Sequence, residues 1–405
     1  MPVTPTVDLR RARLGVTLLF MTNGLVIANL APRYPELRTS IGLSYGELGL
    51  AIMFAGAGAL TFGLSAAALI RRFSSARVGA VSMIAMSIAA ALATFSPNGF
   101  VFAAVLFIVG SFDSIVDVAQ NSHGLRVQRE YRRTIVNSFH AMWSVGAVLG
   151  GLMGGGAAGI GLPLQLHLSL VAGLVIVINL VGYRLLLPGP EPQPERTESP
   201  LHRLSFRRVA PAVWLTLGML SLVSIAGAWV EDAGISWSAS YLFDELNAGA
   251  TVASLGLVSL MAMHFVGRLV GDRLIDRFGQ RAVVRVGGLI TAVGMGGALL
   301  FPTIPLTIVG FGLAGLGVAT TIPAAMHAAD ELPGFRVGTG LTVVSWALRV
   351  GFMLSPVVVG VIADATSLRV GLSAVVVAGL LLMLLAQAMS TATATDTHTR
   401  SDPPA

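Results

Sequence analysis

Two aspartates stand four residues apart in an otherwise apolar stretch, "GSFDSIVDVAQN" at residues 110–121. Residues at positions i and i+4 of a helix share one face, so Asp113 and Asp117 project in the same direction. Repulsion between two such carboxylates favours protonation of one of them. A carboxyl group that binds and releases a proton suits proton-coupled chemistry, whereas the alternative is a structural ion pair with a neighbouring helix. For Asp113 we favour proton binding. For Asp117 both proton binding and a structural ion pair remain open.

A basic residue and a histidine also occur within apolar stretches. Arg349 lies well inside such a run, where a guanidinium must pair with an acid or face water. His140 begins the apolar run that follows the two aspartates. We expect its ring to donate a hydrogen bond to Asp117 or Asn121 and so to fix two helices, with proton relay as the alternative.

Amides, an acid and an indole could contact a polar ligand. Asn23 and Asn121 offer amides, although asparagine between packed helices equally often only joins them. Glu231 and Asp232 end one apolar run before "GISWSASY", a Gly- and Ser-rich stretch that predicts a broken helix. Glu231 with the indole of Trp237 at the mouth of a cavity would suit a sugar-like or cationic ligand. Both residue types are also ordinary at a membrane interface.

Outside these few side chains the sequence is strongly apolar. Of its 405 residues, 54% are hydrophobic and 11% are charged, against about a quarter charged in a soluble protein. Long apolar blocks of this kind are typical of a helical membrane protein that crosses the bilayer many times. Cysteine and lysine are absent, which excludes disulfides, thiolate nucleophiles, cysteine metal sites and side-chain Schiff bases. We therefore expect neither an enzyme nor a bound metal or cofactor.

Runs of about 20 apolar residues predict an all-α membrane protein with twelve spanning helices. Of the 26 arginines, 22 fall in segments on one side and three in the opposite loops. The positive-inside rule then predicts that both termini are cytoplasmic. The net charge of +6 is thus explained by the orientation of the chain in a lipid bilayer, and no nucleic-acid partner is needed to account for it. The predicted spans are 14–31, 47–69, 78–96, 100–121, 137–158, 166–187, 210–232, 249–270, 283–301, 305–327, 338–361 and 368–389.

A shift of 205 residues aligns the two parts of the chain. "LIRRF" at 69–73 then falls on "LIDRF" at 274–278, and Gly146 falls on Gly351. Such a repeat is a transporter architecture, with its site near the middle of the membrane. Asp113 has no acidic counterpart and is therefore an addition to the symmetric frame. The predicted parts are two six-helix halves (1–187 and 209–390), a cytoplasmic linker (188–208) and a disordered cytoplasmic tail (391–405).

The stretch "GDRLIDRFGQRAVVR" lies between two predicted spans of the second half. It resembles the signature of the major facilitator superfamily, and Asp276, Arg277, Gly279 and Arg281 match its D-R-x-G-x-R core. In the first-half copy an arginine replaces the acid and Ser74 replaces the glycine. In the family this loop bridges helices and helps to lock one conformation. The resemblance therefore implies a gating role for these four residues.

Other segments are similar to a bacterial branch of that superfamily, related to the rhizopine-biosynthesis membrane protein and loosely to the fucose permeases. They include "NGLVIANLAPRYPELR", "DVAQN", "NSFHAMWSVG", "VEDAGISWSASYLFDEL" and "ADATSLR". The resemblance implies that Glu231 and Trp237 occupy positions of a family acid and a family tryptophan. It also implies that spans 4 and 5 face spans 10 and 11 at the cytoplasmic gate. We therefore expect Asp113 to pair with Arg349 when that gate is closed, with a permanent pair as the alternative.

Together these observations predict a monomeric secondary transporter of the bacterial inner membrane that moves a small solute coupled to protons. Uptake of a sugar or polyol and export of a drug-like or biosynthetic product both remain open, as does a transporter-like sensor without flux. "GAVLGGLMGG" lacks the proline of the drug-antiporter motif, and "GFGLAG" lacks the preceding strand of a dinucleotide site, so both indicate helix packing. The candidate residues are Asp117 and Asp113 for protons, and Asn23, Asn121, Glu231, Trp237 and Arg349 for substrate.

Overall fold

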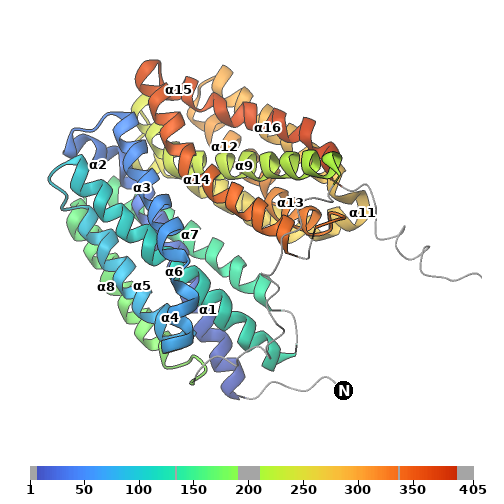
Figure 1. Ribbon diagram of the computed structural model, residues 1–405. Helices are drawn as coiled ribbons and strands as arrows, with labels where there is room; N and C mark the ends of the chain where they lie inside the picture. Colours follow the sequence, from blue (N-terminus) through green and yellow to red (C-terminus); the bar gives the residue numbers. More distant parts are fainter. Residues whose placement is uncertain (1–6, 133–134, 190–209, 336–337, 390–405) are drawn as a thin grey trace, which may run out of the picture. The chain divides into compact units, whose positions relative to one another are not determined.

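The computed structural model describes residues 7–132, 135–189, 210–335 and 338–389, and these contain helices but no strand (Figure 1). Within them, eleven segments are long and apolar enough to cross a membrane. One of the eleven, Ala250–Leu300, contains two of the twelve predicted spans. The all-α expectation is confirmed. Most of the predicted linker, and the whole predicted tail, lie outside the described residues.

The contacts within the chain define two compact units. Unit 1 consists of Met1–Glu195 with Asn247–Val258, and unit 2 consists of Arg196–Leu246 with Ser259–Ala405. Helices α1 to α8 and α10 belong to unit 1, whereas α9, most of α11 and α12 to α16 belong to unit 2. Each unit is therefore built largely from one half of the predicted repeat.

Unit 1 is held together by an apolar core and by close helix crossings. Its core joins Met83 and Met86 of α5 to Val116 of α6 and Val175 of α8. Helix α3 begins with a capping box in which Ser44 and Glu47 each accept the other's backbone N–H. The helices are α1 (Val7–Leu30), η1 (Ala31–Arg33), α2 (Tyr34–Ile41), α3 (Tyr45–Gly63), α4 (Ala66–Phe73), α5 (Ser75–Ala93), α6 (Gly99–Tyr131), α7 (Val136–Gly159), α8 (Leu164–Tyr183) and α10 (Ala250–Ala253).

The glycines of "GAVLGGLMGG" lie on two faces of α7. A Cβ on Gly146 would overlap the backbone of Met21 in α1, and one on Gly150 would lie 2.6 Å from the carbonyl oxygen of Leu25. On the other face, Thr251 of α10 donates a hydrogen bond to the carbonyl oxygen of Gly155 at 3.2 Å. Small residues allow membrane helices to approach this closely. The motif is thus explained by packing on both sides of α7.

Unit 2 differs from expectation in its first helix. Helix α9 does not end near Asp232 but continues to Ser240 and then through a π-helical turn. The expected break is wrong because glycine and serine remain helical where every backbone group must bond internally. Gly234 instead allows Leu260 of α11 to pack against the α9 backbone. The elements are α9 (Pro211–Ser240), η3 (Tyr241–Glu245), α11 (Leu255–Leu300), α12 (Ile304–Val318), α13 (Thr321–Asp330), α14 (Thr339–Ala365), α15 (Leu368–Gly371), α16 (Ser373–Leu385) and η4 (Ala386–Ala388).

The internal repeat is visible in packing as well as in sequence. In unit 1, Gly146 of α7 lies against Met21 of α1. In unit 2, Gly351 of α14 lies against Ile225 of α9, so the aligned glycines perform the same task in both units. The expectation of two pseudo-symmetric halves is confirmed by this correspondence.

Candidate functional site

One hydrogen-bonded group of polar side chains joins three helices inside unit 1. Asn23 of α1 donates its amide N–H to Oδ1 of Asp113 in α6, at 2.8 Å. The carbonyl oxygen of the same amide accepts the indole N–H of Trp143 in α7, at 2.7 Å. Asn23 is buried, with 4% of its surface exposed, and its amide nitrogen also lies 3.8 Å from the sulfur of Met86. We call Asn23, Asp113 and Trp143 the amide triad.

The chemistry of the amide triad fixes its orientation. An indole N–H can only donate, so the Asn23 oxygen must face Trp143 and the Asn23 nitrogen must face Asp113. The carboxyl group of Asp113 is therefore offered a donor whether or not it carries a proton. Asp113 is half-buried. A carboxyl group held in this way, next to a membrane-embedded core, can gain and lose a proton without losing its partner.

Asp117 lies one helical turn further along α6 and is exposed. Asn121 donates its amide N–H to Oδ1 of Asp117 at 3.0 Å and to the backbone carbonyl of the same residue at 2.9 Å. Two of the predicted site residues are thus brought together. His140 places its ring edge-on to Phe20, with the ring centroids 5.1 Å apart. Its expected hydrogen bond to Asp117 or Asn121 stays a prediction.

A second ionisable pair lies inside unit 2. Nδ1 of His264 in α11 is 3.9 Å from Oε1 of Glu231 in α9, and both side chains are at least 90% buried. Because the two residues are 33 positions apart, the sequence offered no signal for this pair. The packing of α11 on α9 through Gly234 and Leu260 brings them together. Glu231 was expected to contact substrate, whereas His264 was not among the predicted site residues.

Asp232 follows Glu231 and lies beside two serines. Ser236 donates to Oδ1 of Asp232 at 3.3 Å, and Ser355 of α14 lies next to the same carboxyl group. Oδ2 of Asp232 is buried and accepts no hydrogen bond from the described residues. A buried carboxyl oxygen without a donor is costly for an ionised acid and tolerable for a protonated one. Asp232 is therefore a further candidate for proton binding that the sequence did not single out.

Two predicted substrate contacts have contrasting environments. Trp237 is fully buried in α9, so it is not a side chain of an exposed membrane-interface belt. Arg349 is exposed on α14. Asp113 belongs to unit 1 and Arg349 to unit 2, and their expected pairing stays a prediction.

The residues of the superfamily signature surround one break in α11. Gly279 has φ +77° and ψ 157°, and the chain is helical on both sides of it, so the expected loop is a single-residue kink. Asp276 and Arg277 precede the kink and are exposed. Beyond the kink, Arg281 donates to the carbonyl oxygens of Gln387 at 2.8 Å and Met389 at 3.1 Å. Arg281 therefore fastens the end of η4 to the kink.

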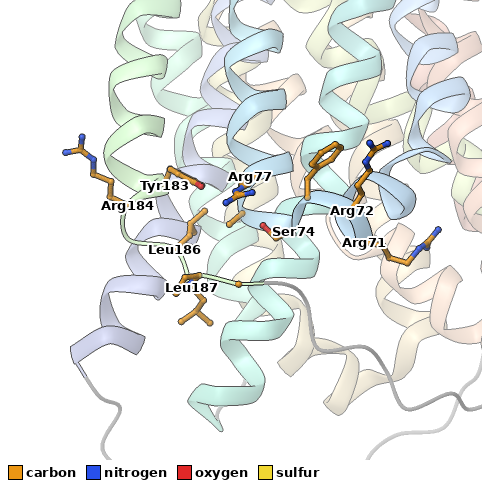
Figure 2. Close-up of a pocket in the computed structure, with 12 residues that line it drawn as sticks. Arg71, Arg72, Ser74, Arg77, Tyr183, Arg184, Leu186 and Leu187 are labelled. Carbon is orange, nitrogen blue, oxygen red and sulfur yellow. The ribbon is translucent and has the colours of Figure 1, made fainter.

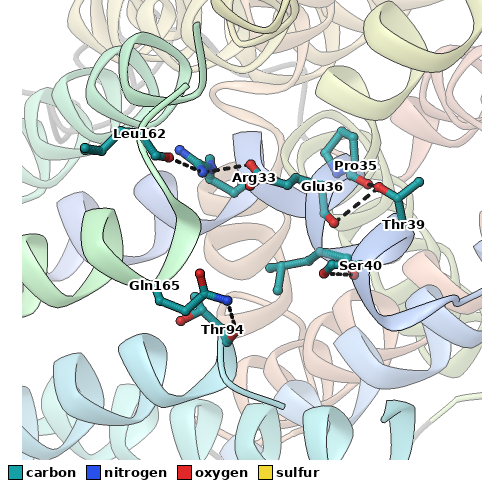
Figure 3. A network of polar contacts seen from close by, with 9 residues as sticks. Arg33, Pro35, Glu36, Thr39, Ser40, Thr94, Leu162 and Gln165 are labelled. Carbon is teal, nitrogen blue, oxygen red and sulfur yellow. Dashed lines mark hydrogen bonds and ion pairs between the residues drawn. The ribbon is translucent and has the colours of Figure 1, made fainter. Parts of the chain in front are cut away.

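A buried arginine, Arg33, lies in η1 directly after α1 of unit 1 and holds several polar contacts there (Figure 3). Arg33 is 1% exposed and pairs with Glu36 at 2.7 Å. It also donates to the carbonyl oxygen of Leu162, just after α7, at 2.9 Å. Nearby, the Gln165 side chain donates to the carbonyl oxygen of Thr94 at 3.2 Å and so links α8 to the end of α5. Arg33 is one of the three arginines that the sequence places in loops between spans on the side with few arginines, but its side chain is buried within the folded unit.

No cluster of three or more metal-binding side chains occurs in the part of the chain that the structure describes. Ionisable side chains predicted to lie within the spans instead occur in the amide triad, in the Asp117 and Asn121 pair, in the Glu231 and His264 pair, and at Asp232 beside Ser236. Ionisable groups are costly inside membrane helices and are kept there with polar partners, as these are. A repeated helical membrane fold with sites of this kind defines a transporter.

The comparisons with known proteins agree with this class. The profile of the Major Facilitator Superfamily matches residues 16–241 and 222–404, and the chain belongs to this superfamily. The membrane protein MosC of Rhizobium meliloti is 29% identical over 91% of this chain and 88% of its own length. The uncharacterized transporter y4wD of Sinorhizobium fredii is 30% identical over 90% of this chain and 96% of its own length.

Solved structures share the fold at low sequence identity. The nucleoside transporter NupG, in a mutant form, has a TM-score of 0.76 at 12% identity, covering 93% of this chain and 98% of its own. A bacterial homologue of the human lysosomal transporter Spinster, in an inward-facing, occupied conformation, has a TM-score of 0.74 at 16% identity. The match covers 95% of this chain and 97% of the homologue. A D-xylose–proton symporter has a TM-score of 0.72 at 15% identity, and the match covers 93% of this chain and 96% of the symporter. The chain is thus a secondary transporter by family and fold, and not an enzyme.

Proposed function

We propose that this transporter couples the movement of a small polar solute to protons, with Asp113 as the principal proton-binding group. The observation that carries the proposal is the amide triad, in which Asn23 holds Asp113 at 2.8 Å inside a bundle of apolar helices. The bond persists in either protonation state, so a change of charge on Asp113 alters its attraction to ions and solutes without dismantling the site. The D-xylose–proton symporter of similar fold couples a sugar to protons, which supports the same chemistry here.

Unit 2 supplies the second part of the proposal. Glu231 and His264 are buried against each other on α9 and α11, and the half-buried Asp232, next to Glu231 in the chain, has one carboxyl oxygen without a donor among the described residues. We assign these residues to solute binding or to a second proton. Hydroxyl groups of a sugar or polyol would supply the donor that Asp232 lacks. A polar, hydroxyl-bearing solute therefore fits this group better than a lipophilic one.

The test is made on purified protein in two stages. A thermal-shift screen with sugars, polyols, amino compounds and lipophilic cations, run at several pH values, first finds a ligand. Proteoliposomes that contain a pH-sensitive dye then report whether that ligand moves protons. We expect a polar ligand to drive proton movement in wild type, and the Asp113→Asn variant to bind the ligand without moving protons.

Three results would contradict parts of the proposal. Equal proton movement in wild type and Asp113→Asn would exclude Asp113 as the coupling group, and Asp117→Asn and Asp232→Asn would then locate it. Binding without any flux in wild type would identify a sensor. Flux driven outward from loaded vesicles, with lipophilic cations as ligands, would identify an exporter.

We also propose that the protein resides in the cytoplasmic membrane as a monomer with both termini in the cytoplasm. The distribution of 22 arginines against three supports this orientation. Because the chain contains no cysteine, single cysteines can be introduced without a background. An impermeant maleimide should label Pro97→Cys in intact cells and Arg129→Cys only after permeabilisation. The reverse pattern would invert the topology, and a mass above one chain in native mass spectrometry would exclude the monomer.

A further inference from the structure

A hollow of about 480 Å³ opens at one end of unit 1, and four arginines are among the residues that line it (Figure 2). One wall is the turn between α4 and α5, and the other is the chain that follows α8. Figure 2 shows Ser74 and Arg77 between Tyr183 and Arg72, whereas Arg184 points away. We call this the basic hollow, and its principal lining residues are Arg71, Arg72, Ser74, Arg77, Tyr183 and Arg184.

A buried histidine ties the two walls of the basic hollow together. His123 of α6 is 0% exposed. Its Nδ1 is 2.7 Å from the hydroxyl of Ser75, at the turn that forms the first wall. Its Nε2 accepts the backbone N–H of Leu187, in the second wall, at 3.1 Å. Because Nε2 accepts, Nδ1 carries the proton and donates to Ser75.

An arginine that does not line the hollow fixes the second wall further. Arg126, one turn after His123 on α6, donates to the carbonyl oxygens of Pro188 at 2.8 Å and Gly189 at 3.2 Å. Both of these residues line the hollow. The hollow is therefore a built feature of the unit, held open by α6, and not a gap between loose loops.

The arginines of the hollow have no counter-charge within the described residues. Arg71, Arg72, Arg77 and Arg184 form no ion pair with any acid that the structure describes. The guanidinium of Arg72 instead lies over the ring of the adjacent Phe73, 5.1 Å from its centre.

The second half of the repeat lacks this excess of charge. There Asp276 occupies the position of Arg71. The hollow that lies beside the Gly279 kink in unit 2 is lined by apolar residues, glycines and one threonine, without any arginine. A hollow lined by unneutralised arginines is thus found beside the turn of the first half and not beside the kink of the second, and its charge is available for an external anion.

We propose that the basic hollow binds the phosphate headgroup of an anionic membrane lipid. Guanidinium groups match phosphate oxygens in geometry as well as charge. Basic pockets at the cytoplasmic ends of membrane helices suit such headgroups. A lipid fits better than free phosphate because Phe73, which is 44% exposed, presents an aromatic face for an acyl chain beside the arginines. The side of the membrane is the one that the arginine distribution predicts to be cytoplasmic.

The experiment compares lipids on delipidated protein in a neutral detergent. Phosphatidylglycerol and cardiolipin are titrated against phosphatidylcholine and inorganic phosphate, and binding is read by thermal shift and by native mass spectrometry. The test variant is Arg72→Gln with Arg77→Gln. The matched control is Arg273→Gln with Arg285→Gln, which removes two exposed arginines of α11 outside the hollow.

We expect the anionic lipids to stabilise wild type and the control equally. In the test variant the affinity should fall about 30-fold, because each arginine near such a headgroup is worth about 1 kcal/mol. Equal loss in the test and control variants would reduce the effect to general surface charge and overturn the proposal. Stabilisation by inorganic phosphate at equal concentration would overturn the lipid source, and no bound lipid on any variant in native mass spectrometry would overturn the site.

Discussion

Ser74 and Gly279 adopt the same backbone conformation 205 residues apart, with φ 76° and ψ 151° at Ser74 and φ 77° and ψ 157° at Gly279. Each residue forms the break between two consecutive helices of its unit. This region of conformational space is open to glycine and strained for every other residue. The turn of the repeat is thus preserved in shape where its sequence has diverged, and Ser74 bears the strain.

We predict that Ser74→Gly stabilises the protein by about 1 kcal/mol, because relief of backbone strain exceeds the added entropy of an unfolded glycine. The opposite exchange, Gly279→Ser, should destabilise it by about 1–3 kcal/mol for the same reason. Thermal unfolding of both variants in one detergent measures the pair. Destabilisation by Ser74→Gly would show that the serine side chain matters more than its backbone.

The glycines of α7 allow a second matched pair of variants. We predict that Gly146→Val destabilises unit 1 by about 3 kcal/mol, at the upper end of the usual cost of overpacking, because a Cβ there overlaps the backbone of Met21. Gly156→Val, in the same helix, meets nothing within 4 Å and should be nearly neutral. Expression level and thermal stability of the two variants give the comparison. Equal stability would mean that α1 and α7 can separate without cost.

Two variants of the amide triad distinguish a role in proton binding from a role in stability. In Asp113→Asn the new amide can still accept from Asn23, so the unfolding temperature should stay close to that of wild type while the pH dependence of transport is lost. In Asn23→Leu, both Asp113 and the Trp143 indole lose a partner, which should cost about 2 kcal/mol of stability. Indole fluorescence of Trp143 should change only in the second variant. A large stability loss in Asp113→Asn would identify a structural aspartate.

The Glu231 and His264 pair is suited to a double-mutant cycle. Because the two side chains are buried 3.9 Å apart, removing either should affect the other. We predict that Glu231→Gln, His264→Gln and the double variant give an interaction energy of about 1–3 kcal/mol in thermal stability. The interaction should depend on pH, since the imidazole attracts the carboxylate most strongly when protonated. Additive effects at every pH would exclude coupling between the two residues.

Much of the architecture follows from the sequence alone. Apolar runs of about 20 residues define the spans, because a membrane helix must bury its backbone along its whole length. The shift of 205 residues correctly equates Gly146 with Gly351, which pack against α1 and α9 respectively. The grouping of Asp117 with Asn121 likewise follows from helical periodicity, since an i, i+4 pair shares one face.

Tertiary structure decided what lies opposite each of these residues. The end of α9 was misjudged because Gly234 and its neighbouring serines weaken a helix in water but serve close packing in a membrane. Asn23 meets Asp113 across 90 residues, and His264 meets Glu231 across 33, and no spacing rule links residues so far apart. Local periodicity gives each helix its polar face. Only the packing of the helices determines which polar faces meet.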